Sequence, residues 1–136
     1  MATSTVKYLG HLRTEATHLQ SASTIITDAP TDNKGKGEAF SPTDLTATSL
    51  ASCMITVMGI KAAEANIPFN EVTAEVTKIM GGPPRKITEI RIKIRISRRN
   101  LSDKDRTILA ETAHTCPVAL SLHPDIKVKL EFDYFD

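Results

Sequence analysis

The chain has 136 residues, of which 40% are hydrophobic and 24% are charged, and its formal net charge is +1. A chain of this length can bury a sizeable core, so we expect residues 1–136 to form a single domain. The composition argues against a disordered chain, and the near-neutral charge with few aromatic residues argues against a nucleic-acid-binding protein.

The N-terminal segment MATSTVKYLGHLR has no basic region followed by an apolar one, so it does not resemble a secretory signal. The later uncharged run, Leu45 to Ile60, is shorter than the ~18 residues expected of a membrane span. We therefore expect a cytoplasmic protein with no membrane partner. A lasting structural disulfide is uncommon in that compartment.

Strand-forming residues are spread through Thr5 to Asp28, and a polar stretch divides them into groups. This pattern predicts two or three antiparallel strands. The next segment, Ala29 to Phe40, is rich in Gly, Pro, Asn and Asp and is expected to form a loop. The loop is long enough to suggest a functional role or an oligomer contact.

A helix is predicted to begin at Ser41, with Ser41 as its N-cap and Pro42 at the first helical position. Asp44 lies in the first turn, where the helix dipole favours an acid. The helix should end near Ala65, before a proline. Its apolar residues show little amphipathicity, so we expect a central helix that is covered on most sides.

Two alternating segments follow, and they predict an antiparallel hairpin closed by the turn GGPPRK. In the first, Glu71 to Ile79, apolar and polar residues alternate. In the second, the inward positions are isoleucines at 90, 92, 94 and 96. The basic cluster Arg95, Arg98 and Arg99 is interpreted as the solvated end of the second strand.

The last third of the chain predicts a helix, a break and a strand. Ser102 and Asp105 form a capping pattern at the start of the helix, and Pro117 disfavours helical geometry at Cys116. A final strand is expected from Ile126 to Tyr134. The order of elements predicts an α+β fold, an antiparallel sheet with helices on one side.

The two cysteines, Cys53 and Cys116, carry most of the functional information, and the residues leave several roles open. Both could be small buried apolar residues, which is the usual role of a free cysteine, or they could be redox-active or nucleophilic thiols. If Pro117 starts a helical turn, Cys116 is its N-cap, where backbone N–H groups favour a thiolate. Cys53 lies inside its helix and needs a cation from another part of the chain. His114, Cys116 and His123 match no zinc-binding spacing.

Two segments, SPTDLTATSLASCM (Ser41 to Met54) and AHTCPVALSLH (Ala113 to His123), resemble the OsmC/Ohr family of organic hydroperoxide reductases. The resemblance extends over nearly the whole chain in the order of its elements. It implies antiparallel sheets wrapped around long central helices in an intertwined homodimer, with active sites at the subunit interface.

The resemblance also implies roles for individual residues. Cys53 would be the peroxidatic cysteine, Cys116 the resolving cysteine, and Arg13 the cation over the reactive thiolate. The alternative for Arg13 is a solvated strand residue. The family usually has a glutamate after the helix-opening proline to orient this arginine, whereas this chain has Thr43. Asp44 would lie on the helix face opposite Cys53, so Glu38 in the loop is the better candidate.

The activity implied is reduction of an organic hydroperoxide through a Cys53 sulfenic acid and a Cys53–Cys116 disulfide. An external dithiol, of lipoyl type in the family, would restore the thiols, and no metal or bound organic cofactor is needed. Two alternatives stay open. One is a non-catalytic module that binds a small hydrophobic ligand, which the departure at Thr43 favours, and the other is a thiol redox sensor.

Overall fold

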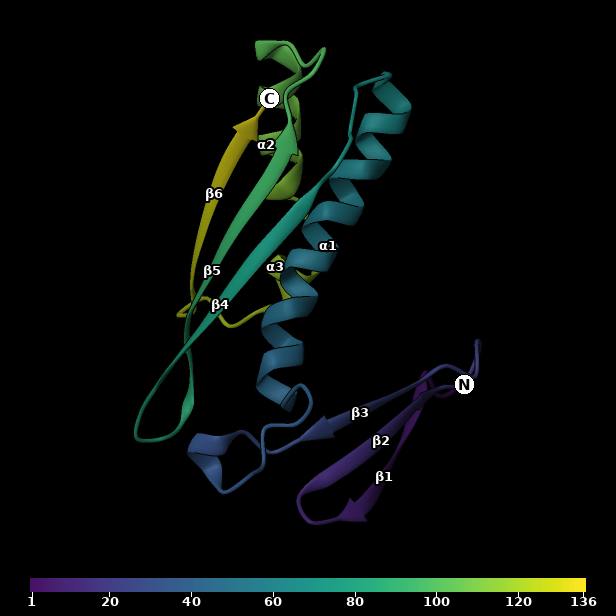
Figure 1. The fold of residues 1–136 in the computed structure, drawn as a ribbon, viewed down its shortest axis with the longest axis vertical. Coiled ribbons are helices and arrows are strands. Elements are labelled where there is room, and N and C mark those ends of the chain that lie inside the picture. Colours follow the sequence, from purple (N-terminus) through teal and green to yellow (C-terminus); the bar gives the residue numbers. More distant parts are fainter. The chain divides into compact units, whose positions relative to one another are not determined.

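The computed structural model describes residues 1–136 and divides the chain into two compact units, Met1–Thr46 and Ala47–Asp136. Each unit contains one three-stranded sheet (Figure 1), with strand order β1-β2-β3 in the first and β4-β5-β6 in the second. Sheets and helices occur together without regular strand–helix alternation, so the predicted α+β class is confirmed. The prediction of a single domain stays a prediction.

The first unit is an antiparallel meander of β1 (Ser4–Gly10), β2 (Arg13–His18) and β3 (Thr24–Asp28), as predicted. The loop after β3 contains a short 3-10 turn at Thr31–Asn33. It folds back tightly on the end of the strand, because a Cβ atom at Gly35 would lie only 1.7 Å from the carbonyl oxygen of Ala29. This return brings the second half of the loop beside the end of β3.

Helix α1 (Pro42–Ala65) has the predicted bounds and the predicted cap. The Asp44 N–H donates to Oγ of Ser41 at 3.0 Å, and the Ser41 N–H donates to Oδ2 of Asp44 at 3.0 Å. Two backbone donors at the helix start are thereby satisfied reciprocally. The Asp44 carboxylate thus serves the helix start.

The burial of α1 differs from the prediction that most of its sides are covered. Its buried residues form one stripe at helical spacing, Ala47, Leu50, Ala51, Met54, Met58 and Ala62. Ile60 is exposed and Cys53 is only half-buried. Small and apolar residues occur on both faces of this helix, so the sequence pattern could not distinguish the face that packs within the chain from the face that does not.

By length and composition alone, α1 is the one helix that could cross a membrane. A single helix of this kind is weak evidence for a membrane protein, because core helices of soluble proteins pass the same test. Its buried stripe packs against the sheet of the second unit, which is how a core helix behaves.

The sheet of the second unit confirms the predicted hairpin and corrects one pairing. β4 (Thr73–Gly81) and β5 (Lys86–Ser97) are antiparallel, but β6 (Lys127–Phe135) runs parallel to β5. The expectation of wholly antiparallel sheets is therefore wrong for β6. The reason is the crossover between β5 and β6 through α2 (Asp103–Ala113) and α3 (Pro117–Ser121), which returns the chain in its original direction.

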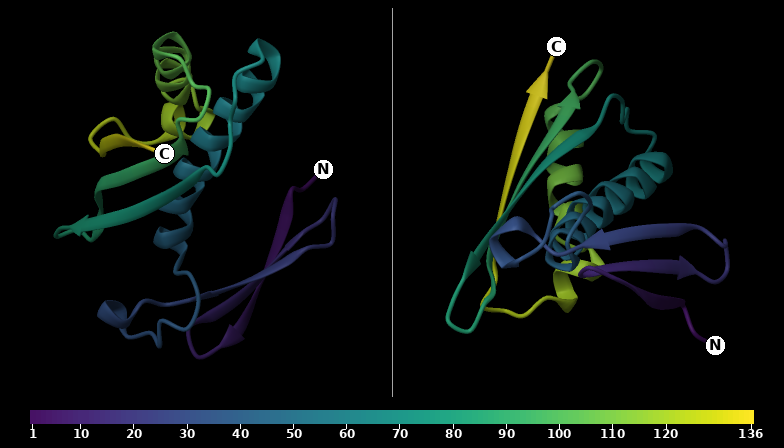
Figure 2. Two further views of the ribbon diagram at one scale, coloured as in Figure 1. Left: turned by 45° about the horizontal axis from the view of Figure 1, so that its top comes forward. Right: turned by 60° about the horizontal axis from the view of Figure 1, so that its bottom comes forward.

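The core of the second unit lies between this sheet and the helices α1 and α2, which cover the same face of it (Figures 1 and 2). The isoleucines predicted to face inward, Ile90, Ile92, Ile94 and Ile96, are all buried. Leu109 and Ala113 of α2 belong to the same cluster. Helix α2 begins with the predicted capping box of Ser102 and Asp105 and ends three residues before Cys116, so the packing of α2 delivers Cys116 into the core.

Candidate functional site

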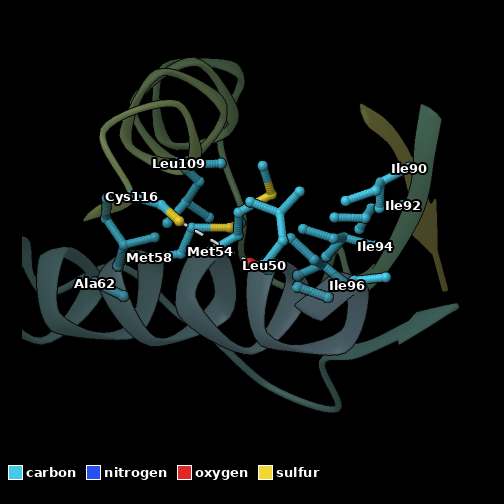
Figure 3. Close-up of a cluster of buried hydrophobic side chains, with 14 of the residues drawn as sticks. Leu50, Met54, Met58, Ala62, Ile90, Ile92, Ile94, Ile96, Leu109 and Cys116 are labelled. Atoms are coloured by element: carbon cyan, nitrogen blue, oxygen red, sulfur yellow. Dashed lines mark hydrogen bonds between the residues drawn. The ribbon is translucent and has the colours of Figure 1, made fainter. Parts of the chain in front are cut away.

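Cys116 is the N-cap of α3, as the Cys-Pro sequence predicted. The Ala119 N–H donates to its Sγ atom at 3.4 Å, and the thiol lies 4.0 Å from the carbonyl oxygen of Leu50 on α1. The side chain is 0% exposed. Figure 3 shows it within the cluster formed by Leu50, Met54 and Leu109, so the cap opens into an apolar core and not into solvent.

The pKa of Cys116 is raised above that of an ordinary thiol. Burial is the largest cause, and the Cys53 thiol adds to it both as a hydrogen-bond neighbour and through its charge. The backbone N–H groups of Ala119 and Val118 act in the opposite direction. The predicted cap therefore exists, but its preference for a thiolate is outweighed by the apolar surroundings, and Cys116 holds its proton at neutral pH.

Cys53 lies on α1, is half-buried and has no disulfide partner in this structure. Its effect on Cys116 shows that the two free thiols are neighbours, although they are 63 positions apart in the sequence (116 − 53). Met54 and Met58 are buried on the same helix, and Val57 is partly buried against the core. The arrangement is a dithiol in which one sulfur is enclosed and the other is within reach of solvent.

We predict that iodoacetamide labels Cys53 well before Cys116 in the folded protein. Alkylation requires an accessible thiolate, and Cys116 is both enclosed and raised in pKa. Because its pKa is raised and its sulfur is enclosed, labelling of Cys116 should stay slow as the pH rises through the ordinary thiol range. Peptide mass spectrometry over a pH series measures this. In urea both cysteines should react alike, and preferential labelling of Cys116 at neutral pH would contradict the prediction.

Arg13 is the first residue of β2 and lies directly opposite Asp28, the last residue of β3, in the antiparallel register. Its Nη2 atom donates to Oδ2 of Asp28 at 3.1 Å and lies 3.6 Å from Oε2 of Glu38. Hydrogen bonding to Asp28 and its charge are the main causes that raise the pKa of Arg13. Two carboxylates therefore hold the guanidinium of Arg13, whose side chain remains partly exposed.

Asp28 is the residue of this cluster that the sequence did not single out. Its side chain is 1% exposed, and its Oδ2 atom also accepts a hydrogen bond from the Glu38 N–H at 3.0 Å. That backbone hydrogen bond is the largest cause lowering the pKa of Asp28, and Arg13 adds to it. The sequence shows an aspartate at the end of the strand region, in Asp-Ala-Pro, but only the strand register reveals that Arg13 is its partner.

Glu38 lies beside Arg13, and Thr43 lies at the start of α1. Glu38 does contact Arg13, but at a longer distance than Asp28 does, and its side chain is 60% exposed. Its backbone N–H does more than its carboxylate, since it fixes Asp28. Thr43 lies at the start of α1, with its hydroxyl 3.2 Å from that of Ser41.

The structure thus forms two groups. Arg13, Asp28 and Glu38 meet in the first unit, and Cys53 and Cys116 meet in the second. No three His, Cys, Asp or Glu side chains are grouped so that they could hold a metal ion. Chemically, the first group is a pre-ordered cation, and the second is a pair of thiols that can be oxidised together.

Comparisons with known proteins agree on the fold. Residues 35–131 match the model of a family described as OsmC-like protein. A crystal structure from Psychrobacter arcticus, of a protein provisionally described as an osmotic-stress-induced and detoxification-response protein, is 57% identical, covering 98% of this chain and 96% of that one with a TM-score of 0.92. A search of curated proteins found no match.

Two further solved structures are similar at low sequence identity and therefore support the fold alone. An organic hydroperoxide resistance protein OsmC from Legionella pneumophila is 19% identical, with 98% of each chain covered and a TM-score of 0.75. An organic hydroperoxide resistance protein from Elizabethkingia anophelis is 18% identical, covering 99% of this chain and 98% of that one with a TM-score of 0.77.

Proposed function

Because this chain belongs to the OsmC-like protein family, we propose that it is a thiol-dependent peroxidase that reduces organic hydroperoxides. The observation that carries the proposal is the pairing of a half-buried thiol, Cys53, with an enclosed thiol, Cys116, inside an apolar core. Two proteins of the same fold are named organic hydroperoxide resistance proteins, and the proposal extends that substrate class to this chain.

In the proposed first step, the Cys53 thiolate attacks the terminal oxygen of the hydroperoxide. The O–O bond breaks, the sulfur gains a hydroxyl group as a sulfenic acid, and the alkoxide takes up a proton and leaves as an alcohol. In the second step the Cys116 sulfur attacks the Cys53 sulfur, a disulfide forms, and the displaced hydroxide leaves as water with the Cys116 proton. An external dithiol then reduces the disulfide by exchange and is itself oxidised to a disulfide.

The raised pKa of Cys116 suits this order of events. Two neighbouring thiolates would repel each other, and ionisation of Cys53 makes Cys116 hold its proton more strongly. Cys116 therefore stays a thiol until Cys53 has been oxidised. The same proton is then available for the hydroxide that leaves when the disulfide forms.

We propose that Arg13 supplies the positive charge that stabilises the Cys53 thiolate, and that Asp28 replaces the family's glutamate as the carboxylate that orients it. The support is the hydrogen bond from Arg13 to Asp28, the burial of Asp28 and the additional contact with Glu38. An arginine held by two carboxylates loses little conformational freedom when it engages a third anion. Thr43 then does not remove the orienting function.

The proposed substrate carries a hydrocarbon tail. Val57 shares α1 with Cys53, is apolar and is only partly buried, so it favours such a tail over hydrogen peroxide. An external dithiol of lipoyl type is the proposed reductant. The proposed assembly is a homodimer in the cytoplasm, without nucleic-acid or membrane partners.

The test is turnover of cumene hydroperoxide with dihydrolipoamide as reductant. We expect continuous consumption with one dithiol oxidised per hydroperoxide, and without reductant a disulfide that peptide mass spectrometry assigns to Cys53 and Cys116. No consumption with any dithiol, together with no disulfide, would favour a module that binds a hydrophobic ligand. Ready disulfide formation with very slow turnover would favour a redox sensor.

A further inference from the structure

A second polar site lies at the end of the second unit, away from the thiols. A cavity of about 440 Å³ is lined by Arg98, Arg99, Arg106 and Asp136. This volume is within the range of small-molecule sites, about 300–1,000 Å³. The four side chains carry three positive charges and one negative charge, so the cavity has an excess of two positive charges.

The backbone fixes two of these arginines. Arg98 and Arg99 directly follow β5 and begin a tight turn that is closed by the Leu101 N–H donating to the Arg98 carbonyl at 3.0 Å. Asn100 has a φ of 60°, which asparagine tolerates better than most residues. The Arg98 N–H also donates to the Phe135 carbonyl at 2.8 Å, which ties the turn to the end of β6.

The three guanidinium groups are not equally neutralised. The charge of Arg98 is balanced by a two-point contact with Asp136, at 2.5 Å from Nε and 3.0 Å from Nη2. The Arg106 guanidinium lies over the ring of Tyr134, 5.0 Å from its centroid, and its Nε atom is buried without a hydrogen-bond partner. Its one ion pair, with Asp103 at 3.6 Å, involves an almost fully exposed carboxylate.

Arg99 has no ion pair and its side chain is exposed. The cavity therefore has one arginine paired with a carboxylate of the cavity, one whose ion pair is with an exposed carboxylate at 3.6 Å, and one without an ion pair. Asp136 already provides the cavity with one carboxylate, which pairs with Arg98. An anion with two charges and several acceptor oxygens would match what remains, and a phosphate monoester carries close to two negative charges at neutral pH.

From this arrangement we propose that the cavity binds the phosphate group of a small phosphorylated molecule. Arg99 supplies a free fork of donors, and Arg106 supplies a guanidinium charge that lies over the Tyr134 ring and is offset only by the 3.6 Å ion pair with Asp103. Arg98 contributes charge while it remains paired with Asp136. The cavity is larger than a phosphate group needs, so the rest of the ligand would extend from it. In this proposal Arg98 and Arg99, which the sequence indicated as the solvated end of a strand, are part of a binding site.

The experiment is calorimetric titration of the full chain with inorganic phosphate near pH 7.5, in parallel with succinate, a dicarboxylate of similar charge. We expect saturable phosphate binding that weakens about tenfold in Arg99→Gln, because one charge-assisted contact is lost. Arg106→Lys keeps the charge but removes the planar guanidinium that can contact phosphate at two points, and it should weaken binding as well. Added sodium chloride should weaken phosphate binding by the unsubstituted protein, because it screens the arginine charges.

Lys104→Gln is the matched control, because it removes one positive charge from an exposed position on α2 outside the cavity. Its phosphate affinity should equal that of the unsubstituted protein. Circular dichroism checks that each variant is folded, and Arg99 is exposed, so its replacement tests the site even if Arg106→Lys unfolds. Unchanged affinity in Arg99→Gln, an equal loss in Lys104→Gln, or equally tight binding of succinate would overturn the proposal.

Discussion

Replacing Cys53 with serine will lower the rate of cumene hydroperoxide reduction by at least about a thousandfold. In the proposed reaction the Sγ atom of Cys53 is the nucleophile. A serine hydroxyl stays protonated at neutral pH and is a poor nucleophile towards peroxide oxygen. The half-buried position tolerates the change, since the hydroxyl is of similar size and can still reach solvent. Stopped-flow measurement of hydroperoxide consumption, with the protein's fold checked by circular dichroism, gives the result.

Cys116→Ser is the matched variant for this prediction. Serine is a good N-cap, so its hydroxyl can accept the Ala119 N–H as the thiol does, and α3 should be retained. We expect this variant to consume one equivalent of hydroperoxide per chain, to accumulate a sulfenic acid at Cys53 that dimedone traps, and to form no internal disulfide. If Cys53→Ser retained most of the activity, or if Cys116→Ser failed to react at all, the assigned roles would be wrong.

Arg13→Ala will slow formation of the Cys53 sulfenic acid by about a hundredfold, the usual cost of removing a positioned charge or donor from a reacting group. The rate in Arg13→Lys should lie between those of the unsubstituted protein and Arg13→Ala. Lysine keeps a positive charge but not the planar fork that Asp28 and Glu38 hold. The rate of dimedone-trapped product, measured in single turnover, reports this step without the reductant. Arg95→Ala is the control, since it also removes a paired arginine, in this case from Asp133. Equal effects in the two alanine variants would contradict the role of Arg13.

Asp28→Asn separates orientation from charge in the same experiment. The pKa of Asp28 is lowered by the Glu38 N–H and by Arg13, so the carboxylate stays ionised at neutral and mildly acidic pH. Its contribution is therefore present above the ordinary aspartate range and is lost as the pH falls through its lowered pKa. The unsubstituted protein should react faster than Asp28→Asn at neutral pH, and the two should converge only in strong acid. A constant ratio at every pH would show that the Asp28 charge plays no part.

Local patterns in the sequence predicted most of the secondary structure. The Ser-Pro start of α1, the capping box of α2 and the proline after Cys116 each act within a few residues, so their effect does not depend on the rest of the fold. The alternating isoleucines of β5 likewise record which face of a strand is buried. The two cysteines could be recognised as the candidate dithiol through their family resemblance.

Other features depend on where the chain returns after many residues, and the tertiary structure alone decides them. The parallel direction of β6 follows from a crossover of two helices, and the choice of Asp28 as the partner of Arg13 follows from the register of β2 and β3. The protonation of Cys116 follows from burial against α1, which outweighs the local cap. Local sequence sets caps and periodicity because neighbours interact whatever the fold, whereas pairing, burial and charge depend on contacts between residues that only packing brings together.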